Sequence, residues 1–329
     1  MDYSNSNSFP LIFLGSGSYL PQHVIKNIDL PAHLDTSDEW IRTRSGITQR
    51  HKSSSEETTS FMATQSLIKA LDHAKIKATD LDAIIVATTT ADHTFPSTAA
   101  RVQANVKADK AFVFDIQAAC SGFVYAYSMA ENMVISGQAK HIAIIGAEHM
   151  TKIVDWNDRG TCVLFGDGAG AIIVSSNNQS NVNEKIKATS YLFSDGCGYD
   201  KLYVDPTIKT PEEKGAIVMD GKEIFKKAIL KMGQAIEVVL EKNNISIEDI
   251  DYIIPHQANA RIIKGIADRF NLPSEKVIVT VDVHANTSAA SIPLALDVSL
   301  KNRTLKNNST VLIVGMGAGI TWGASLLRI

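Results

Sequence analysis

Apolar, β-branched runs recur along the chain without polar alternation, and stretches of helical character separate them. Unalternating strands of this kind are typical of sheets that helices cover on both faces, so the pattern predicts an α/β fold. Four stretches carry apolar residues at helical spacing; in one of them Phe225, Met232 and Val239 share a stripe. The predicted strands are 81–89, 111–116, 141–146, 250–255, 276–281 and 310–315. The predicted helices are roughly 57–76, 121–136, 222–242 and 288–300.

The order of these elements repeats. The first strands of the two halves begin 169 residues apart, at 81 and 250, and the last strands, at 141 and 310, have the same offset. We interpret this agreement as a duplication, although any two α/β halves share part of such an order. The polar stretch 175–185 marks the boundary between the halves.

The duplication predicts two domains that share one site. The N-terminal half, 1–178, carries a candidate nucleophilic cysteine, and the C-terminal half, 179–329, carries a candidate histidine and asparagine. Corresponding loops at strand ends then converge on one crevice between the halves.

Charge and cysteine content narrow the function classes. The 32 basic and 35 acidic residues give a formal net charge of −3, which argues against nucleic acid or an anionic membrane as the main partner. The chain has no apolar run of about eighteen residues and no basic leader before an apolar stretch, so we expect a cytoplasmic protein. Its three cysteines lack CxxC spacing, which indicates neither a disulfide framework nor a metal site.

Cys120 directly follows one predicted strand and precedes a predicted helix. Backbone N–H groups and the helix dipole at such a position stabilise a thiolate, the reactive form of cysteine. A buried structural role is the ordinary alternative, and we keep that interpretation for Cys162 and Cys197, which lack this setting. The small neighbours that leave room for a substrate are Ala118, Ala119, Ser121 and Gly122.

Two candidate partners of Cys120 lie in the second half. His256 follows strand 250–255, where it can donate a hydrogen bond to a developing oxyanion or move a proton; a satisfied core histidine is the alternative. Asn286 occupies the loop equivalent to that of Cys120, and its amide donors never change charge, which suits binding of an enolate oxygen. Helix capping by its NTS sequence is the alternative.

Two glycine-rich runs suggest nucleotide-binding loops at first sight. GDGAGA (166–171) and GMGAG (315–319) lack the GxGxxG spacing and precede β-like runs, so we reject a dinucleotide site and expect no cofactor. We interpret both as tight turns before strands, one of which can point an N–H at Cys120. GxxxxGK[ST], HExxH and GxSxG motifs are also missing from the sequence, so kinase, metalloprotease and serine-hydrolase functions lose their usual support.

Segment 36–51 places Trp40 beside Arg42, Arg44 and Arg50. Such a tryptophan can stack on a flat ring while the arginines meet phosphates, and a solvated charged helix is the alternative.

From GSGSYLP (15–21) to TWGASLLRI (321–329), nearly the whole chain resembles the β-ketoacyl-acyl-carrier-protein synthase III family. The resemblance rests on motifs that occur in the family's order: TSDEWIRTRSGI, FPSTA, AACSGF, RGTCVLFGDGAGA, MDGKEIFK, PHQANARII, HANTSAASIP and GAGITWG. It implies a thiolase-like fold with two duplicated α/β halves in five αβαβα layers, working as a homodimer. The implied activity initiates type II fatty-acid synthesis.

The resemblance also implies a reaction and its residues. Cys120 would take a short acyl group from acyl-CoA, and the enolate of decarboxylated malonyl-acyl-carrier-protein would attack it. His256 and Asn286 would bind the malonyl thioester oxygen, and the N–H groups of Cys120 and Ala318 would form the acyl oxyanion hole. Phe95 would help to close the partner subunit's acyl pocket.

Two binding surfaces follow from the same resemblance. The residues implied for CoA are Thr36, Trp40, Arg44, Arg159, Gly221, Phe225 and Asn259. Those implied for docking an acidic carrier protein are Lys226, Gln257, Ala258 and Arg261, with Lys222, Lys227, Lys264 and Arg269 nearby.

The chain departs from the family at one turn. Two other functions also remain as alternatives. Where many relatives have phenylalanine and then GGGF, this chain has Met316, Gly317, Ala318, Gly319 and Ile320, and a non-glycine at Ala318 implies ordinary backbone dihedrals or mild strain. An acyltransferase that moves the acyl group to an amine or alcohol, and a noncatalytic partner subunit, are the alternatives. The intact set of Cys120, His256 and Asn286 favours condensation.

Overall fold

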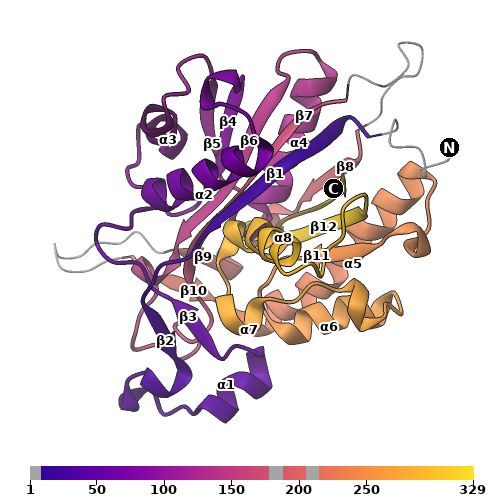
Figure 1. The fold of residues 1–329 in the computed structure, drawn as a ribbon. Coiled ribbons are helices and arrows are strands. Elements are labelled where there is room, and N and C mark those ends of the chain that lie inside the picture. The colour runs from indigo at the N-terminus through magenta and orange to yellow at the C-terminus, as the bar shows by residue number, and fades with distance from the viewer. Residues whose placement is uncertain (1–8, 178–187, 205–214) are drawn as a thin grey trace.

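Two large β-sheets with helices on both faces form five αβαβα layers in the computed structural model, which describes residues 9–177, 188–204 and 215–329 (Figure 1). The first sheet has the order β1-β7-β6-β4-β5, and the second has the order β11-β12-β13-β8. The strands of the first sheet are β1 (Leu11–Tyr19), β4 (Ala83–Ala87), β5 (Phe112–Ile116), β6 (His141–His149) and β7 (Asp167–Ser176). Those of the second are β8 (Ser190–Ser194), β11 (Tyr252–Pro255), β12 (Thr310–Gly317) and β13 (Thr321–Arg328).

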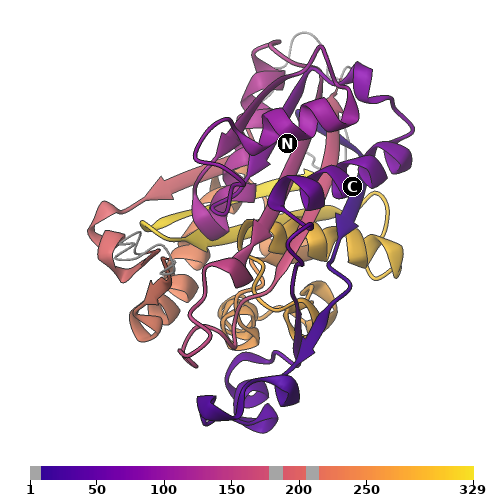
Figure 2. The same ribbon diagram turned by 90° about the vertical axis from the view of Figure 1, so that its left-hand side faces the viewer.

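The described residues contain eight α-helices, and six of them build the other layers. The outer layer on the first sheet holds α2 and α3, the middle layer α4 and α8, and the outer layer on the second sheet α5 and α6. They are α1 (Asp38–Ser45), α2 (Thr59–Ala74), α3 (Thr98–Val106), α4 (Gly122–Ile135), α5 (Gly221–Asn243), α6 (Ala260–Arg269), α7 (Val281–His284) and α8 (Ser291–Lys301). Two small sheets, β2 (Val24–Lys26) with β3 (Gln49–His51) and β9 (Leu202–Val204) with β10 (Ile217–Met219), complete the fold. In Figure 2, α1, β2 and β3 project from one end of the molecule.

Apolar cores separate the layers. In the middle core Ile85 of β4 and Ile144 of β6 meet Phe123 of α4 and Leu296 of α8, and Ile313 of β12 approaches from the second sheet. These side chains are almost fully buried, and burial of each contributes roughly 1.5–3 kcal/mol of hydrophobic free energy. The middle layer therefore fixes the two sheets relative to each other.

The two sheets repeat one topology. In the first, β4 runs parallel to β6, which pairs antiparallel with β7, which pairs antiparallel with β1. In the second, β11, β12, β13 and β8 pair with the same directions in the same order. The last residue of the first sheet's β7 is Ser176 and the second sheet begins with Ser190 of β8, whereas the expected boundary at 178/179 lies outside the described residues.

One predicted strand is wrong. Segment 276–281 corresponds to β5, yet it makes a single bridge, from Ile253 to Val277, instead of a strand. A strand here would need its backbone groups for pairing with β11. Two of these groups instead bind the Gln257 side chain, whose amide donates to the Ile278 carbonyl and accepts from the Thr280 N–H. The second sheet therefore stops at β11.

The glycines of 166–171 also differ from the expectation of a turn, since most of them lie inside β7. A Cβ on Gly170 would stand 2.6 Å from the Leu294 nitrogen, so glycine there permits α8 to approach the sheet closely. In the second run, Gly315 and Gly317 lie in β12 and only Gly319, with φ of 114°, occupies a turn that needs glycine.

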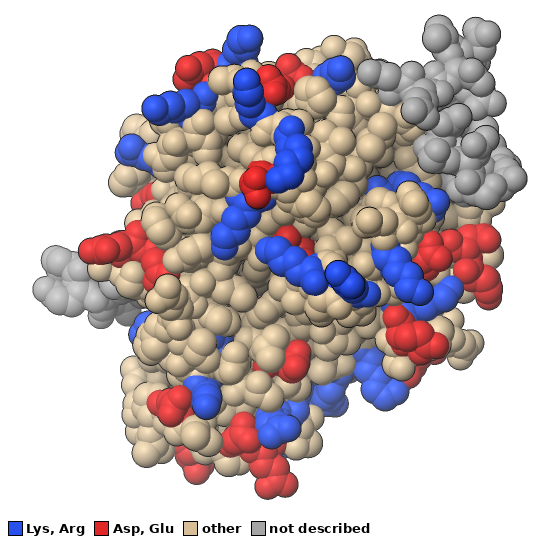
Figure 3. Space-filling view, in the orientation of Figure 1, with Lys and Arg blue, Asp and Glu red and all other residues tan. Residues whose placement is uncertain are grey.

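Basic and acidic side chains are interspersed over the face shown in Figure 3, in keeping with the small net charge. Within the part of the chain that the structure describes, no helix has the length and apolar character needed to cross a bilayer.

Candidate active site

A cavity of about 490 Å³ opens beside Cys120, where loops of the two halves meet. From the first half, Thr89 and Gln117 follow the carboxyl ends of β4 and β5. From the second half, Ser288 and Ala318 complete the wall around the thiol. Apolar side chains contribute much of the remaining lining, among them Met150, Ile153, Phe165, Leu202 and Ile217. The two halves thus share one site, at the strand ends expected to carry chemistry.

Cys120 lies in a short 3-10 helix, Ala119–Ser121, that continues into α4. Ala119, just before the nucleophile, has φ of 45°, a conformation that side chains other than glycine rarely adopt. The second half holds this turn, because the Thr321 hydroxyl donates to the Ala118 carbonyl and Gly317 packs directly against the turn. The predicted strand, turn and helix around the cysteine are confirmed.

The surroundings of Cys120 favour the thiol over the thiolate. Burial, with a smaller contribution from the nearby Glu148 carboxyl, raises the pKa of Cys120 to about 12, although a hydrogen bond with Ser288 acts in the opposite direction. As expected, Cys120 lies at the start of a helix, which favours a thiolate. The cost of burying a charged sulfur away from water is larger, so the net effect favours the protonated thiol. Acyl transfer at neutral pH therefore requires that the thiol proton has an acceptor.

The other two cysteines have different surroundings. Cys162 is buried, as a structural cysteine should be, whereas Cys197 is exposed, so the expectation of burial for Cys197 is wrong.

His256 lies next to the nucleophile's backbone. A Cβ built on Gly315 would stand 3.2 Å from the Cys120 carbonyl oxygen and 3.7 Å from the His256 Cβ, so these two atoms are at most about 7 Å apart. Burial lowers the pKa of His256 to about 3, which keeps the imidazole neutral at physiological pH. Its Nδ1 lies 2.7 Å from Ser291 Oγ, which also accepts a hydrogen bond from the Gln257 N–H.

Asn286 lies in the loop after α7, two residues before Ser288 of the cavity wall. Its backbone pairs with 164–166, since its N–H donates to the Leu164 carbonyl and its carbonyl accepts from the Gly166 N–H. Its carboxamide oxygen accepts from the N–H of Ser288 at 2.9 Å, which leaves the amide N–H groups as the donating end. Asn286 is therefore tied to both Phe165 of the cavity wall and Ser288 beside the thiol.

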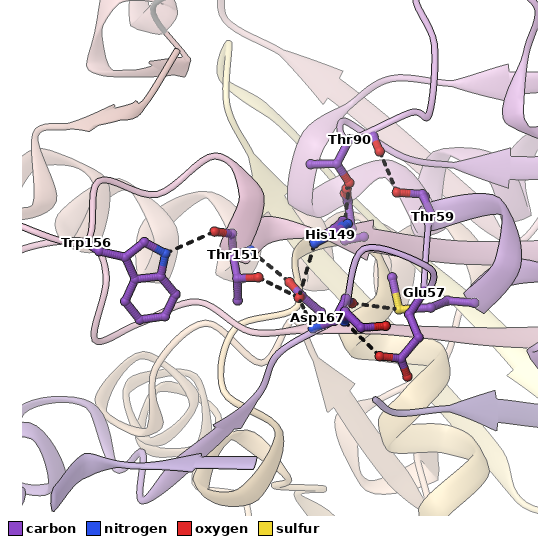
Figure 4. A network of polar contacts seen from close by, with 11 residues as sticks. Glu57, Thr59, Thr90, His149, Thr151, Trp156 and Asp167 are labelled. Carbon is purple, nitrogen blue, oxygen red and sulfur yellow. Dashed lines mark hydrogen bonds and ion pairs between the residues drawn. The ribbon is translucent and has the colours of Figure 1, made fainter. Parts of the chain in front are cut away.

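A buried carboxyl, Glu148, lies behind this wall, and the sequence reasoning missed it. Its Oε1 accepts from the Ser288 hydroxyl at 2.9 Å, and its Oε2 accepts from the Thr90 hydroxyl at 2.6 Å and the Thr89 N–H at 3.1 Å. Thr90 is itself fixed, because the His149 N–H donates to its hydroxyl and Thr59 donates to its carbonyl (Figure 4). Polar residues at the carboxyl ends of predicted strands, TTT after β4 and GAE in β6, were the signal.

The turn at Ala318 explains the departure noted in the sequence. Ala318 lines the cavity, and it is not among the described residues with positive φ, whereas its neighbour Gly319 is. The extra methyl group is therefore tolerated with an ordinary backbone, as expected. Met316 is buried in the core between β12 and α5, so it lies beneath the turn.

Most of the residues expected around CoA cluster at the α1 end of the molecule, and two lie at the start of α5. The guanidinium carbons of Arg44 and Arg159 lie 4.4 Å and 5.4 Å from the Trp40 ring centroid. Asn259 donates to the Arg44 carbonyl and so joins α6 to α1. The remaining three are Thr36, whose buried hydroxyl has no hydrogen-bond partner among the described residues, and Gly221 and Phe225 at the start of α5.

Arg50 does not belong with these arginines. It is fully buried, and its guanidinium donates to Asn27 Oδ1 and to the Val163 carbonyl. The idea that it meets a phosphate is wrong, because the guanidinium is buried and serves Asn27 and the Val163 carbonyl.

The expected docking surface is only partly exposed. Lys226 and Arg261 are exposed, Arg261 lies over the Phe225 ring, and neither forms an ion pair with a described residue. Ala258 is half-buried beside them. Gln257 is fully buried and its side chain serves the backbone around Ile278, so its assignment to a docking surface is wrong. Three nearby basic residues, Lys227, Lys264 and Arg269, have carboxylate partners.

Comparisons with known proteins converge on one family. Models described as 3-oxoacyl-[acyl-carrier-protein (ACP)] synthase III and its C-terminal part match residues 114–189 and 240–329. Beta-ketoacyl-[acyl-carrier-protein] synthase III of Paramagnetospirillum magneticum is 46% identical over 316 residues, which are 96% of this chain and 98% of that protein. The Ehrlichia canis protein of the same name is 49% identical over 318 residues, 97% of this chain and 99% of its own length.

A solved structure agrees with this. The crystal structure of 3-oxoacyl-[acyl-carrier-protein] synthase III from Aquifex aeolicus superimposes with a TM-score of 0.89 and 44% identity, covering 97% of this chain and 100% of that one.

Proposed function

Because the chain belongs to the 3-oxoacyl-[acyl-carrier-protein] synthase III family, we propose that it condenses a short acyl-CoA with malonyl-acyl-carrier-protein to give 3-oxoacyl-acyl-carrier-protein, the step that initiates type II fatty-acid synthesis. The proposal is carried by a cavity-lining thiol, a neutral imidazole close to its backbone, and a carboxamide bound to Ser288 beside it. The chemistry uses only these protein groups and the two thioesters, so it requires no cofactor.

In the first half-reaction the Cys120 sulfur attacks the thioester carbon of the acyl-CoA. The carbonyl oxygen gains negative charge, which the N–H groups of Cys120 and Ala318 stabilise from the helix start and the facing turn. The bond to the CoA sulfur then breaks, CoA leaves as the thiol after taking up a proton, and the acyl group remains on Cys120.

In the second half-reaction malonyl-acyl-carrier-protein loses carbon dioxide and becomes an enolate. Ser291 Oγ accepts from the Gln257 N–H, so we assign its hydroxyl as the donor to His256 Nδ1. Nδ1 is then an acceptor, and the proton of the neutral imidazole lies on Nε2. His256 Nε2–H and the Asn286 amide then hold the enolate oxygen, and both donors are neutral. The enolate carbon attacks the acyl thioester, and the Cys120 sulfur is released.

Substrates approach from the α1 and α6 side. Trp40 between Arg44 and Arg159 provides a flat ring with two cations, which suits an adenine and its phosphates. Exposed Lys226 and Arg261, with Ala258 beside them, provide the docking point for an acidic carrier protein.

A homodimer is part of the proposal. β5 is the edge strand of the first sheet, and an exposed edge readily pairs with another strand. Phe112 on this edge is 37% exposed and Phe95, in the loop after β4, is 83% exposed, which is unusual for large apolar side chains unless a partner covers them. Phe95 would then close the partner subunit's acyl pocket. A cytoplasmic location remains a prediction.

The test is to incubate the protein with acetyl-CoA and malonyl-acyl-carrier-protein and to weigh both proteins by mass spectrometry. We expect an acetoacetyl group on the carrier. Cys120→Ser should abolish the acyl-enzyme, Asn286→Ala should keep it and lose condensation, and the buried control Cys162→Ser should retain both steps. An acetylated enzyme that transfers its acyl group to an amine or alcohol, with no acetoacetyl product, would overturn the proposal.

A further inference from the structure

The Cys120 thiol faces a serine that in turn faces a buried carboxyl. Ser288 hydrogen-bonds the Cys120 side chain, lines the same cavity and donates its hydroxyl proton to Glu148 Oε1 at 2.9 Å. A serine hydroxyl has one proton: while it is directed at Glu148 it accepts from the thiol, and turned toward the sulfur it donates to the thiolate, which lowers the Cys120 pKa. The resulting chain of donors runs from the Cys120 S–H to Ser288 and on to Glu148.

The polar contacts of Glu148 are those of a proton acceptor. The groups that contact its oxygens all donate: the hydroxyls of Thr88, Thr89, Thr90 and Ser288 and the N–H groups of Thr89 and Ala289. No cation pairs with Glu148 among the described residues. Burial raises its pKa above the ordinary range, and these hydrogen bonds oppose that rise by stabilising the carboxylate. The other titratable group at the thiol, His256, stays neutral.

Ser288 is held in the relay position at a conformational cost. Its φ is 49°, and a serine in this region persists only where its surroundings fix it. The N–H of Ser288 donates to Asn286 and its hydroxyl to Glu148, so both ends of the residue are tied.

We infer that Glu148, acting through the Ser288 hydroxyl, receives the Cys120 thiol proton during acylation and returns it to the departing sulfur. Ser288 touches the reacting atom, and Glu148 is a positioning residue that holds the proton behind it. The inference concerns the first half-reaction and so rests on the proposed function.

The step balances. As the Cys120 sulfur bonds to the thioester carbon, its proton passes to Ser288 Oγ, and the Ser288 proton passes to Glu148. In the tetrahedral intermediate both sulfurs are bonded to one carbon, so the leaving sulfur lies beside Ser288. When its bond to carbon breaks, the proton returns by the same route, CoA leaves as the thiol and Glu148 is again a carboxylate.

The chain offers a matched control for the loss of a buried carboxyl. Glu131 of α4 is also fully buried, has a pKa raised by burial, and accepts from the N–H and hydroxyl of Thr189 and the N–H of Ser190. It lies nine residues along the helix from Gly122, the first residue of α4, roughly 13 Å from the nucleophile's end. Glu131→Gln therefore measures the structural effect alone.

The experiment measures two rates against pH in a Cys197→Ser background, which removes the exposed thiol: acetylation by acetyl-CoA, and alkylation of Cys120 by iodoacetamide. With the relay intact, we expect both rates to stay flat between about pH 6 and about pH 9, because the proton moves within the protein. In Glu148→Gln we expect a loss of about 100-fold at neutral pH. The remaining rate should rise tenfold for each pH unit, because hydroxide must then remove the proton.

The controls decide between a relay and a structural role. Glu131→Gln should keep flat pH profiles. Ser288→Ala should show the rate loss and pH dependence expected for Glu148→Gln, so the relay can still be tested if Glu148→Gln fails to fold. Removal of the negative charge alone would lower the Cys120 pKa and speed alkylation, so faster alkylation in Glu148→Gln overturns the inference. A flat profile in Ser288→Ala or in folded Glu148→Gln overturns it as well. Alkylation needs no thioester, so a protein that alkylates as expected but forms no acetyl-enzyme refutes the proposed function and not the relay.

Discussion

Gly317→Ala tests how the second half holds the nucleophile. A Cβ on Gly317 would stand 2.4 Å from the Ala118 carbonyl oxygen and 2.9 Å from the Cys120 nitrogen. Ordinary contact begins at 3.4 Å, so the turn would have to retreat by about 1 Å. The turn cannot yield freely, because Ala119 has a positive φ and Thr321 ties the Ala118 carbonyl.

Two effects of this displacement are expected. Overpacking of this kind lowers the free energy of unfolding by about 1–3 kcal/mol. A displacement of about 1 Å at reacting atoms lowers the rate by about 100-fold. The acylation rate should therefore fall far more than the small loss of folded protein explains.

The assay follows acetylation of Cys120 by intact mass under single-turnover conditions, with urea unfolding for stability. Gly170→Ala is the matched control, because its Cβ would stand 2.6 Å from the Leu294 nitrogen and strain the packing of α8 on β7, where neither residue lines the Cys120 cavity. We expect similar destabilisation in both variants and slow acetylation only in Gly317→Ala. A folded Gly317→Ala protein that acetylates at the wild-type rate would show that this contact does not position the thiol.

Three further predictions follow from the geometry. Burial lowers the pKa of His284 from 6.5 to about 4, so between these pH values only the unfolded state binds the proton and stability falls as pH falls; in His284→Gln the urea midpoint should change less over this range, and an unchanged slope would contradict the shift. Phe112→Asp should convert the dimer to monomer in sedimentation velocity, and a dimer that persists would exclude the β5 edge. The double charge reversal Lys226→Glu with Arg261→Glu should raise KM for the carrier protein several-fold and leave acetylation by acetyl-CoA unchanged, while Lys306→Glu, outside this surface, changes neither; equal effects on both substrates would refute the docking surface.

Much of the fold was predictable because buried strands and amphipathic helices have local periodicity. The predicted helix 121–136 is α4, the helix 222–242 is α5, and the strand 310–315 falls in β12. Segment 276–281 failed because its β-branched composition is that of a strand, while the pairing partner it would need is replaced by the Gln257 side chain. A pairing decided by a residue about twenty positions away has no local signal.

The amino-acid sequence by itself determined the α/β layers, the repeated order of elements and the identity of Cys120, His256 and Asn286 as candidate chemistry, because these depend on residue type and spacing along the chain. Only the tertiary structure decided their protonation. Desolvation raises the pKa of Cys120 and lowers that of His256, and it depends on every layer packed around the cavity. The structure also placed Glu148 behind Ser288, since residues 140 positions apart meet only when the middle helices bring the two sheets together.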